Sequence, residues 1–160
     1  MDNARNTDKE LMDGYAMAAG RTCADFKSMR DRIGWSQNEA ATAMGIDPNT
    51  VKKWENPLAG WDVRPYGWAW IDRMYDAYIS EVDSLIDYAI SEVDRLGIGD
   101  GGTVAISYYR NGQAKGTGIG TRHGEPAGAA NAVSRAVGEY FENTGYTVRY
   151  VWAENGGFIV

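Results

Sequence analysis

The most constraining feature of the chain is a closely spaced set of helix-ending and helix-starting residues within residues 26–55. Gly34 and Gly45 each follow an apolar stretch, which is where a left-handed residue ends a helix. Ser36 and Asp47 stand two residues after these glycines, where the N-cap of the next helix belongs. Because the breaks are so close together, the segment predicts three short helices in place of one long helix or a sheet.

The apolar residues of this segment recur at helical spacing. Phe26 and Ile33 fall on one face of the first helix, and Arg30 lies on the same face. In the third helix, Val51 and Trp54 are expected to be buried. This leaves four polar residues of the third helix facing outward, which are Asn49, Thr50, Lys52 and Lys53.

The segment resembles the phage-repressor type of helix-turn-helix, the XRE or Cro/cI-like family, over about residues 22–65. The matching residues, in chain order, are Met29-Arg30, Trp35-Ser36-Gln37, Glu39-Ala40-Ala41, Met44-Gly45-Ile46, Thr50-Val51 and Trp54-Glu55. The resemblance implies that the third helix is presented to the major groove of double-stranded DNA.

The resemblance also implies roles for single residues. Gln37, which opens the second helix, would hold a backbone phosphate. The first, second, third and sixth residues of the third helix would reach base edges, and these are Pro48, Asn49, Thr50 and Lys53. Pro48 departs from the polar residue usual there and has no backbone donor, so we expect one base contact to be lost or apolar.

Other roles of these residues are less specific. By the same resemblance, Arg30 would pair with Glu55 as a structural ion pair. Asparagine can bond adenine bidentately and lysine can donate to guanine, each worth roughly 1–3 kcal/mol of discrimination. Lys52 is the better candidate for a phosphate contact, which adds affinity without sequence information. The alternatives are that Asn49 only starts a helix and that Lys52 and Lys53 only form a solvated face.

The charge balance opposes DNA binding at first sight. The chain has 16 Lys and Arg against 22 Asp and Glu, whereas a DNA-binding domain is expected to be basic. Residues 21–65 hold seven basic and six acidic residues, while residues 66–100 hold two basic and eight acidic ones. The acid is therefore concentrated outside the helix-turn-helix. A net charge of +1 on residues 21–65 gives only weak electrostatic attraction to DNA, which favours a dimer that reads two half-sites.

The remaining chain predicts an α+β protein. Residues 1–21 would be an N-terminal extension that is partly disordered or a short helix, and residues 22–65 an all-α DNA-binding domain. Residues 66–96 would form one long connecting helix, because they contain no proline and a single early glycine. Residues 101–160 would be a small α+β domain that dimerises the protein.

The long helix carries an apolar seam at alternating four- and three-residue steps, broken only at Glu92. Its expected members are Ile71, Tyr75, Tyr78, Val82, Leu85, Ala89 and Leu96. Ile79, Ile86, Ile90 and Val93 would form a second stripe beside it. A stripe this wide requires a cover. We expect both the C-terminal region and a second copy of the chain to contribute to it.

The C-terminal region predicts a small β-β-α-β unit. Residues 103–109 are rich in β-formers, and Asn111-Gly112 is a hairpin signal before a possible return strand at 113–120. A helix at 127–143 and a strand at 146–152 would follow. A last short strand is expected at 158–160.

The glycine-rich loop 116–128 could suggest nucleotide binding. It contains neither the phosphate-binding pattern G-x-x-x-x-G-K-[ST] nor a G-x-G-x-x-G that opens a helix directly after a strand. His123, the only histidine, lies in this loop without a second base or a metal cluster beside it. Cys23 is the only cysteine, which excludes an internal disulfide and a cysteine-based zinc site. We therefore expect no catalytic residues, no cofactor and no metal. An enzyme that acts on nucleic acid through the His123 loop is a third hypothesis.

The rest of the sequence bears on partners and location. No run approaches the roughly 20 apolar residues of a membrane span, and the N-terminus lacks a hydrophobic signal core. We expect a cytoplasmic protein without a membrane partner. The order of the elements also resembles, more weakly, anti-CRISPR-associated or mobile-element autoregulators with a C-terminal dimerisation domain. This second resemblance rests on Trp54-Glu55, Pro65 and the order of the elements.

Together these features predict a homodimeric repressor that binds an inverted repeat in double-stranded DNA. The alternative is an antitoxin-like protein that binds a partner protein through residues 101–160 and its own promoter through the helix-turn-helix.

Overall fold

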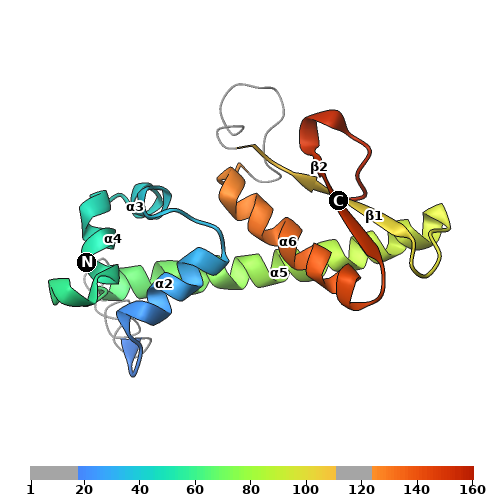
Figure 1. Cartoon of the computed structure of the whole chain (residues 1–160). Coiled ribbons are helices and arrows are strands. Elements are labelled where there is room, and N and C mark those ends of the chain that lie inside the picture. Colours follow the sequence, from blue (N-terminus) through green and yellow to red (C-terminus); the bar gives the residue numbers. More distant parts are fainter. Residues whose placement is uncertain (1–17, 111–123) are drawn as a thin grey trace, which may run out of the picture. The chain divides into compact units, whose positions relative to one another are not determined.

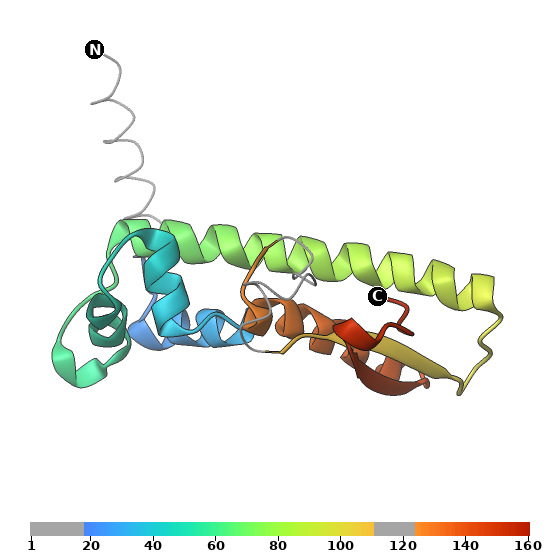
Figure 2. The ribbon, with the colours of Figure 1, turned by 90° about the horizontal axis from the view of Figure 1, so that it is seen from above.

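The computed structural model describes residues 18–110 and 124–160 of the chain (Figure 1). It combines helices with a small parallel sheet, so the chain is of mixed helix and strand content. Two compact units are formed by Met1–Asp76 and Ala77–Val160. Helix α5 (Pro65–Leu96) is continuous over 32 residues and contributes to both units (Figure 2).

The first unit contains three short helices and a helical turn before α5. These are α2 (Cys23–Arg32), α3 (Gln37–Met44), α4 (Pro48–Glu55) and the 3₁₀ turn η1 (Pro57–Ala59). The predicted caps account for the breaks. Ser36 forms a capping box with Glu39, and the Asp47 side chain accepts a hydrogen bond from the Asn49 amide. Gly45 ends α3 in the left-handed conformation at φ 69°.

Aromatic rings fill the core of the first unit. Phe26 makes edge contacts with both Trp54 and Trp68, with ring centroids 5.7 Å apart in each pair. Val51 and Trp54 are fully buried, which confirms the predicted inner face of the third helix. Gly67 in the first turns of α5 lies directly against Trp54, because a Cβ there would stand 2.8 Å from Trp54 Cζ3.

The second unit is built around two parallel strands. Strand β1 (Thr103–Tyr108) pairs with β2 (Thr147–Trp152) in a register that runs from Thr103 opposite Thr147 to Tyr108 opposite Trp152. Helix α6 (Ala127–Asn143) connects them, as parallel strands require a crossover. The 3₁₀ turn η2 (Ala153–Asn155) follows β2.

The core of this unit joins the later part of α5 to β1 and α6. Its buried members are Ala89, Val93, Val104, Ile106, Val133, Val137, Phe141 and Val160. Val93 is buried and Leu96 is half exposed, so the predicted seam is wrong at its last position. The helix ends at Leu96, and Gly97 follows at φ 66°, so no further turn of α5 covers the Leu96 side chain.

The predicted β-β-α-β unit is corrected at its C-terminal end. The expected return strand at 113–120 lies outside the described residues. The expected strand at 158–160 is not a strand, although it runs beside β1. The Ile159 amide donates to the Ala105 carbonyl at 2.8 Å, and the Ser107 amide donates to the Val160 carbonyl at 2.6 Å. Two hydrogen bonds immediately after a glycine turn are too few for a ladder, so the chain is paired without strand geometry.

Candidate nucleic-acid interface

Helix α4 is held in the first unit by one buried face. Val51, Trp54 and Glu55 are the buried residues of this helix. At the preceding turn, the Ile46 amide donates to the Ala41 carbonyl at 3.0 Å, which closes the end of α3 and sets the entry into α4. The opposite face of α4 is therefore presented away from the core.

The exposed face carries short polar and cationic side chains. Asn49, Lys52 and Lys53 are exposed, whereas Pro48 and Thr50 are half-buried. Asn49 and Thr50 lie in the first turn of this eight-residue helix, and Lys53 lies in its last turn. A helix with this polar face can donate hydrogen bonds to base edges and charge to phosphates.

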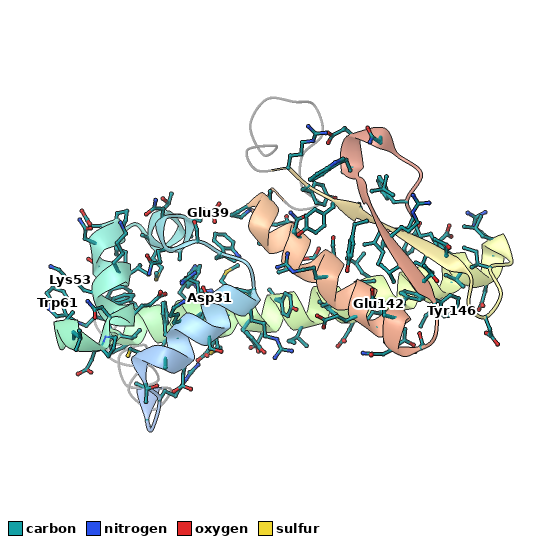
Figure 3. The ribbon with its side chains drawn as sticks, viewed as in Figure 1. Asp31, Glu39, Lys53, Trp61, Glu142 and Tyr146 are labelled. Carbon is teal, nitrogen blue, oxygen red and sulfur yellow. The ribbon has the colours of Figure 1, made fainter. Side chains whose placement is uncertain are left out.

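Lys53 contacts an aromatic ring from outside α4. Its Nζ lies 4.5 Å from the ring centroid of Trp61, which follows η1, as Figure 3 shows for the two labelled residues. The Trp61 side chain is 45% exposed. Lys53 and Trp61 therefore form a cation–π pair at the surface.

A buried ion pair joins α2 to the end of α4. Arg30 Nε lies 2.5 Å from Glu55 Oε1, and Arg30 Nη2 donates to Glu55 Oε2 at 2.8 Å. Arg30 also donates to the Trp35 carbonyl at 2.6 Å. Burial lowers the pKa of Arg30, but the hydrogen bond and charge of Glu55 outweigh it, so this pKa lies above its ordinary value. The pair is a structural lock between α2 and α4.

Gln37 is connected to the same lock. Its Nε2 donates to Glu55 Oε2 at 2.7 Å, which orients the amide at the first residue of α3. An amide nitrogen has two donors, so one contact with Glu55 leaves a second N–H of Gln37 for another acceptor. Glu55 thus brings together Arg30 and Gln37 from two different helices.

The aromatic residues that follow α4 are of two kinds. Trp68 and Trp70 are buried, whereas Trp61 and Tyr66 are about half exposed. Trp61 was therefore missed as a neighbour of Lys53. The sequence signal was weak, because the two residues are eight positions apart and a turn lies between them.

Arg21 was missed as well. It forms a two-pronged contact with Asp72, with nitrogen–oxygen distances of 2.7 and 2.9 Å, and its guanidinium lies 4.1 Å from the Trp68 ring centroid. These contacts fasten the start of α2 to α5 inside the first unit. Arg21 was not distinguishable in sequence from any other charged residue ahead of a helix.

The remaining candidates lie elsewhere. His123 and most of the glycine-rich loop fall outside the described residues. Within residues 18–110 and 124–160, no group of three or more His, Cys, Asp or Glu side chains is arranged to hold a metal ion.

The comparisons with known proteins agree with this geometry. Residues 26–56 match the family model described as Helix-turn-helix. This segment is therefore a helix-turn-helix of the phage-repressor type, and the match supports a DNA-binding transcription regulator. No curated protein and no solved structure matches the chain.

No helix in the described part of the chain is both long enough and apolar enough to cross a membrane.

Proposed function

We propose that the chain is a sequence-specific DNA-binding repressor that acts as a homodimer on an inverted repeat. Residues 22–65 form the DNA-binding domain, and α4 enters the major groove. Asn49, Thr50 and Lys53 contact base edges, while Gln37 and Lys52 contact phosphates.

The observation that carries this proposal is the two-sided character of α4. One face is fixed by buried Val51, Trp54 and Glu55, and the other offers Asn49 and Lys53 to solvent. Buried anchors give the helix a fixed orientation, and a fixed orientation is what direct base recognition requires. The buried Arg30–Glu55 ion pair also fixes the end of α4, which a helix that is only solvated would not require.

Two copies are proposed because one copy is a weak electrostatic ligand for DNA. Residues 21–65 carry only one more basic than acidic residue. Few neutralised phosphates release few counterions, so the affinity of a single domain at physiological salt is small. Two half-sites read together multiply this affinity.

The proposed dimerisation domain is residues 101–160. Tyr150 and Trp152 are 44% and 40% exposed on β2, and both contact Tyr108 on β1. Arg110 lies 4.9 Å from the Trp152 ring centroid. Tyrosine, tryptophan and arginine are the residue types that dominate the energetics of protein interfaces.

The same patch supports the second candidate, an antitoxin-like protein whose C-terminal domain binds a different protein. The two candidates differ in what occupies the patch, a second copy or an unrelated chain. Sedimentation of the purified chain alone at micromolar concentration separates them. A dimer supports the repressor, and a monomer that pairs only with a co-expressed neighbouring gene product supports the antitoxin.

Selection from a random DNA pool, followed by gel-shift and footprinting, tests DNA recognition itself. We expect an enriched sequence with two inverted half-sites, protected on one face of the duplex. A pool that stays random, or a single enriched half-site, contradicts the proposal.

A further inference from the structure

We propose that Trp61 is a positioning residue for Lys53: its indole ring holds the lysine ammonium in place at the end of α4, so that Lys53 discriminates one base pair. This inference rests on the proposed function and deepens it. It adds a determinant of specificity outside the matched segment 26–56.

The turn after α4 brings the ring to this position. The Asn56 side chain accepts a hydrogen bond from the Leu58 amide at 3.0 Å and begins η1. Gly60 then adopts the left-handed conformation at φ 66° and ends η1. The next residue is Trp61, whose ring lies against Lys53 Nζ. A short, capped turn therefore sets the place of the ring.

The exposure of Trp61 distinguishes it from the core tryptophans. Trp54 is fully buried and Trp68 is 2% exposed, whereas Trp61 is 45% exposed. The contacts Phe26–Trp54 and Phe26–Trp68 already fill the core of the unit. Trp61 thus places a large ring at the surface, and the described contact of that ring is with a cation of the proposed DNA-reading face.

Lysine benefits from such a support more than other DNA-contacting residues do. Its ammonium is a compact charge on a flexible stem, so it pairs with phosphates and bases of many geometries. A ring on one side of the ammonium restricts its position and leaves N–H donors free on the other side. A restricted ammonium donates well to an acceptor pair at one place, such as N7 and O6 of guanine, and poorly to acceptors elsewhere.

Two other roles for Trp61 make different predictions. If the ring only covers the turn, its loss weakens the fold and lowers affinity for all DNA alike. If the ring holds Lys53 back from DNA, its loss strengthens binding to the operator. Selectivity, the ratio of operator to random-DNA affinity, therefore separates the three roles.

The test uses the full chain and the sequence enriched by selection as operator. Trp61→Ala is expected to lower selectivity about two- to five-fold, the size of an exposed cation–π contact converted to a binding ratio. The loss should fall at one base pair in a panel of single-base operator variants. Trp61→Phe keeps a ring and should retain part of the selectivity. Leu58→Ala is the matched control, since Leu58 is 94% exposed in the same turn, and it should leave selectivity unchanged.

A double-mutant cycle with Lys53→Ala completes the test. Once Lys53 is removed, Trp61→Ala should cause no further loss of selectivity, since the ring has nothing to position. Equal losses on operator and random DNA, tighter operator binding, or a Trp61 effect that persists without Lys53 would each overturn the inference. Failure of the proposed function is distinguishable, because it would appear as a wild-type chain without any operator preference.

Discussion

At the scale of single residues, the last turns of α4 use charge in two opposite ways. Lys53 is exposed, while Glu55, two residues later, is buried against Arg30. An exposed charge is screened by water and salt and acts mainly on an arriving polyanion. A buried charge is tolerated only with its partner and fixes the geometry around it. The two residues therefore bear on different measurable quantities, binding and folding.

Lys53→Ala and Lys52→Ala form a matched pair for binding. We expect Lys53→Ala to cost about 1–3 kcal/mol on the operator and to relax specificity at one base pair. Lys52→Ala should weaken binding to all sequences alike and reduce the slope of log affinity against log salt by about 1. Titrations at several salt concentrations measure both effects. Equal losses on operator and random DNA for Lys53→Ala would make Lys53 a phosphate contact only.

Glu55→Ala tests the buried lock. It leaves the Arg30 guanidinium with the half-exposed Asp31, 2.8 Å away, as its remaining carboxylate partner. We expect the change to lower the free energy of unfolding by about 3 kcal/mol, the lower end of the cost of breaking a buried pair. It also removes the acceptor of the Gln37 amide. Urea unfolding followed by circular dichroism measures the loss.

Replacing both partners separates pairing from burial. Arg30→Met with Glu55→Met removes both charges and keeps volume, so it should cost less than Glu55→Ala alone. A double variant as unstable as the sum of the single changes would show that the two side chains stabilise the unit independently.

At the scale of elements, α5 and α6 each accept a glycine where alanine has the better helix propensity by roughly 1 kcal/mol. Gly67 of α5 lies against the buried Trp54 and against Val63. Gly138 of α6 lies against the hydroxyl end of Tyr150, whose side chain is 44% exposed. Gly67 therefore lies against a buried ring that has no room to move, whereas Gly138 lies against a half-exposed side chain that can move.

Gly67→Ala is expected to destabilise the protein by about 1–3 kcal/mol in spite of the better propensity. Its Cβ would lie 2.8 Å from Trp54 Cζ3 and 2.9 Å from Val63 Cγ1, and a fully buried indole has no room to move. Gly138→Ala is the control. The tip of Tyr150 can turn toward solvent, so the change should be close to neutral. Thermal unfolding of both variants gives the comparison, and similar effects would contradict this account.

The same elements show what sequence can and cannot predict. Ser36, Gly45 and Asp47 act through neighbours within four residues, so the bounds of α3 and α4 followed from their spacing. The parallel pairing of β1 with β2 depends on residues more than 40 positions apart. The hairpin expected at Asn111-Gly112 lies outside the described residues. Long-range pairing is decided by the whole unit and leaves no local pattern.

In the candidate site, too, the features set by near neighbours could be predicted from the sequence, and those set by the fold of a turn could not. The burial of Val51 and Trp54 and the exposure of Asn49 and Lys53 followed from the local pattern of α4. The contact of Lys53 with Trp61 depends on how Gly60 turns the chain, which spacing alone does not specify. The exposure of Leu96 likewise depends on where α5 ends and what packs beside it.

At the scale of the whole molecule, the chain is an acidic protein with a nearly neutral helix-turn-helix. Residues 66–100 hold eight of its 22 acidic residues and only two of its 16 basic ones. Long-range attraction to DNA is therefore weak, and non-specific binding is held down by the acid elsewhere in the chain. Under the proposed function, selective binding then depends on reading two half-sites at once.

A change in half-site spacing tests this dependence directly. Two linked domains reach half-sites on the same face of the duplex, one or more helical turns of about 10–10.5 base pairs apart. Inserting about five base pairs rotates one half-site to the opposite face, so we expect affinity to fall by at least about tenfold, toward that of one half-site. Inserting about ten base pairs restores the facing and should recover part of the loss. Gel-shift titrations on the three operators measure the pattern. Affinity that is unchanged by both insertions would mean that one copy reads one half-site.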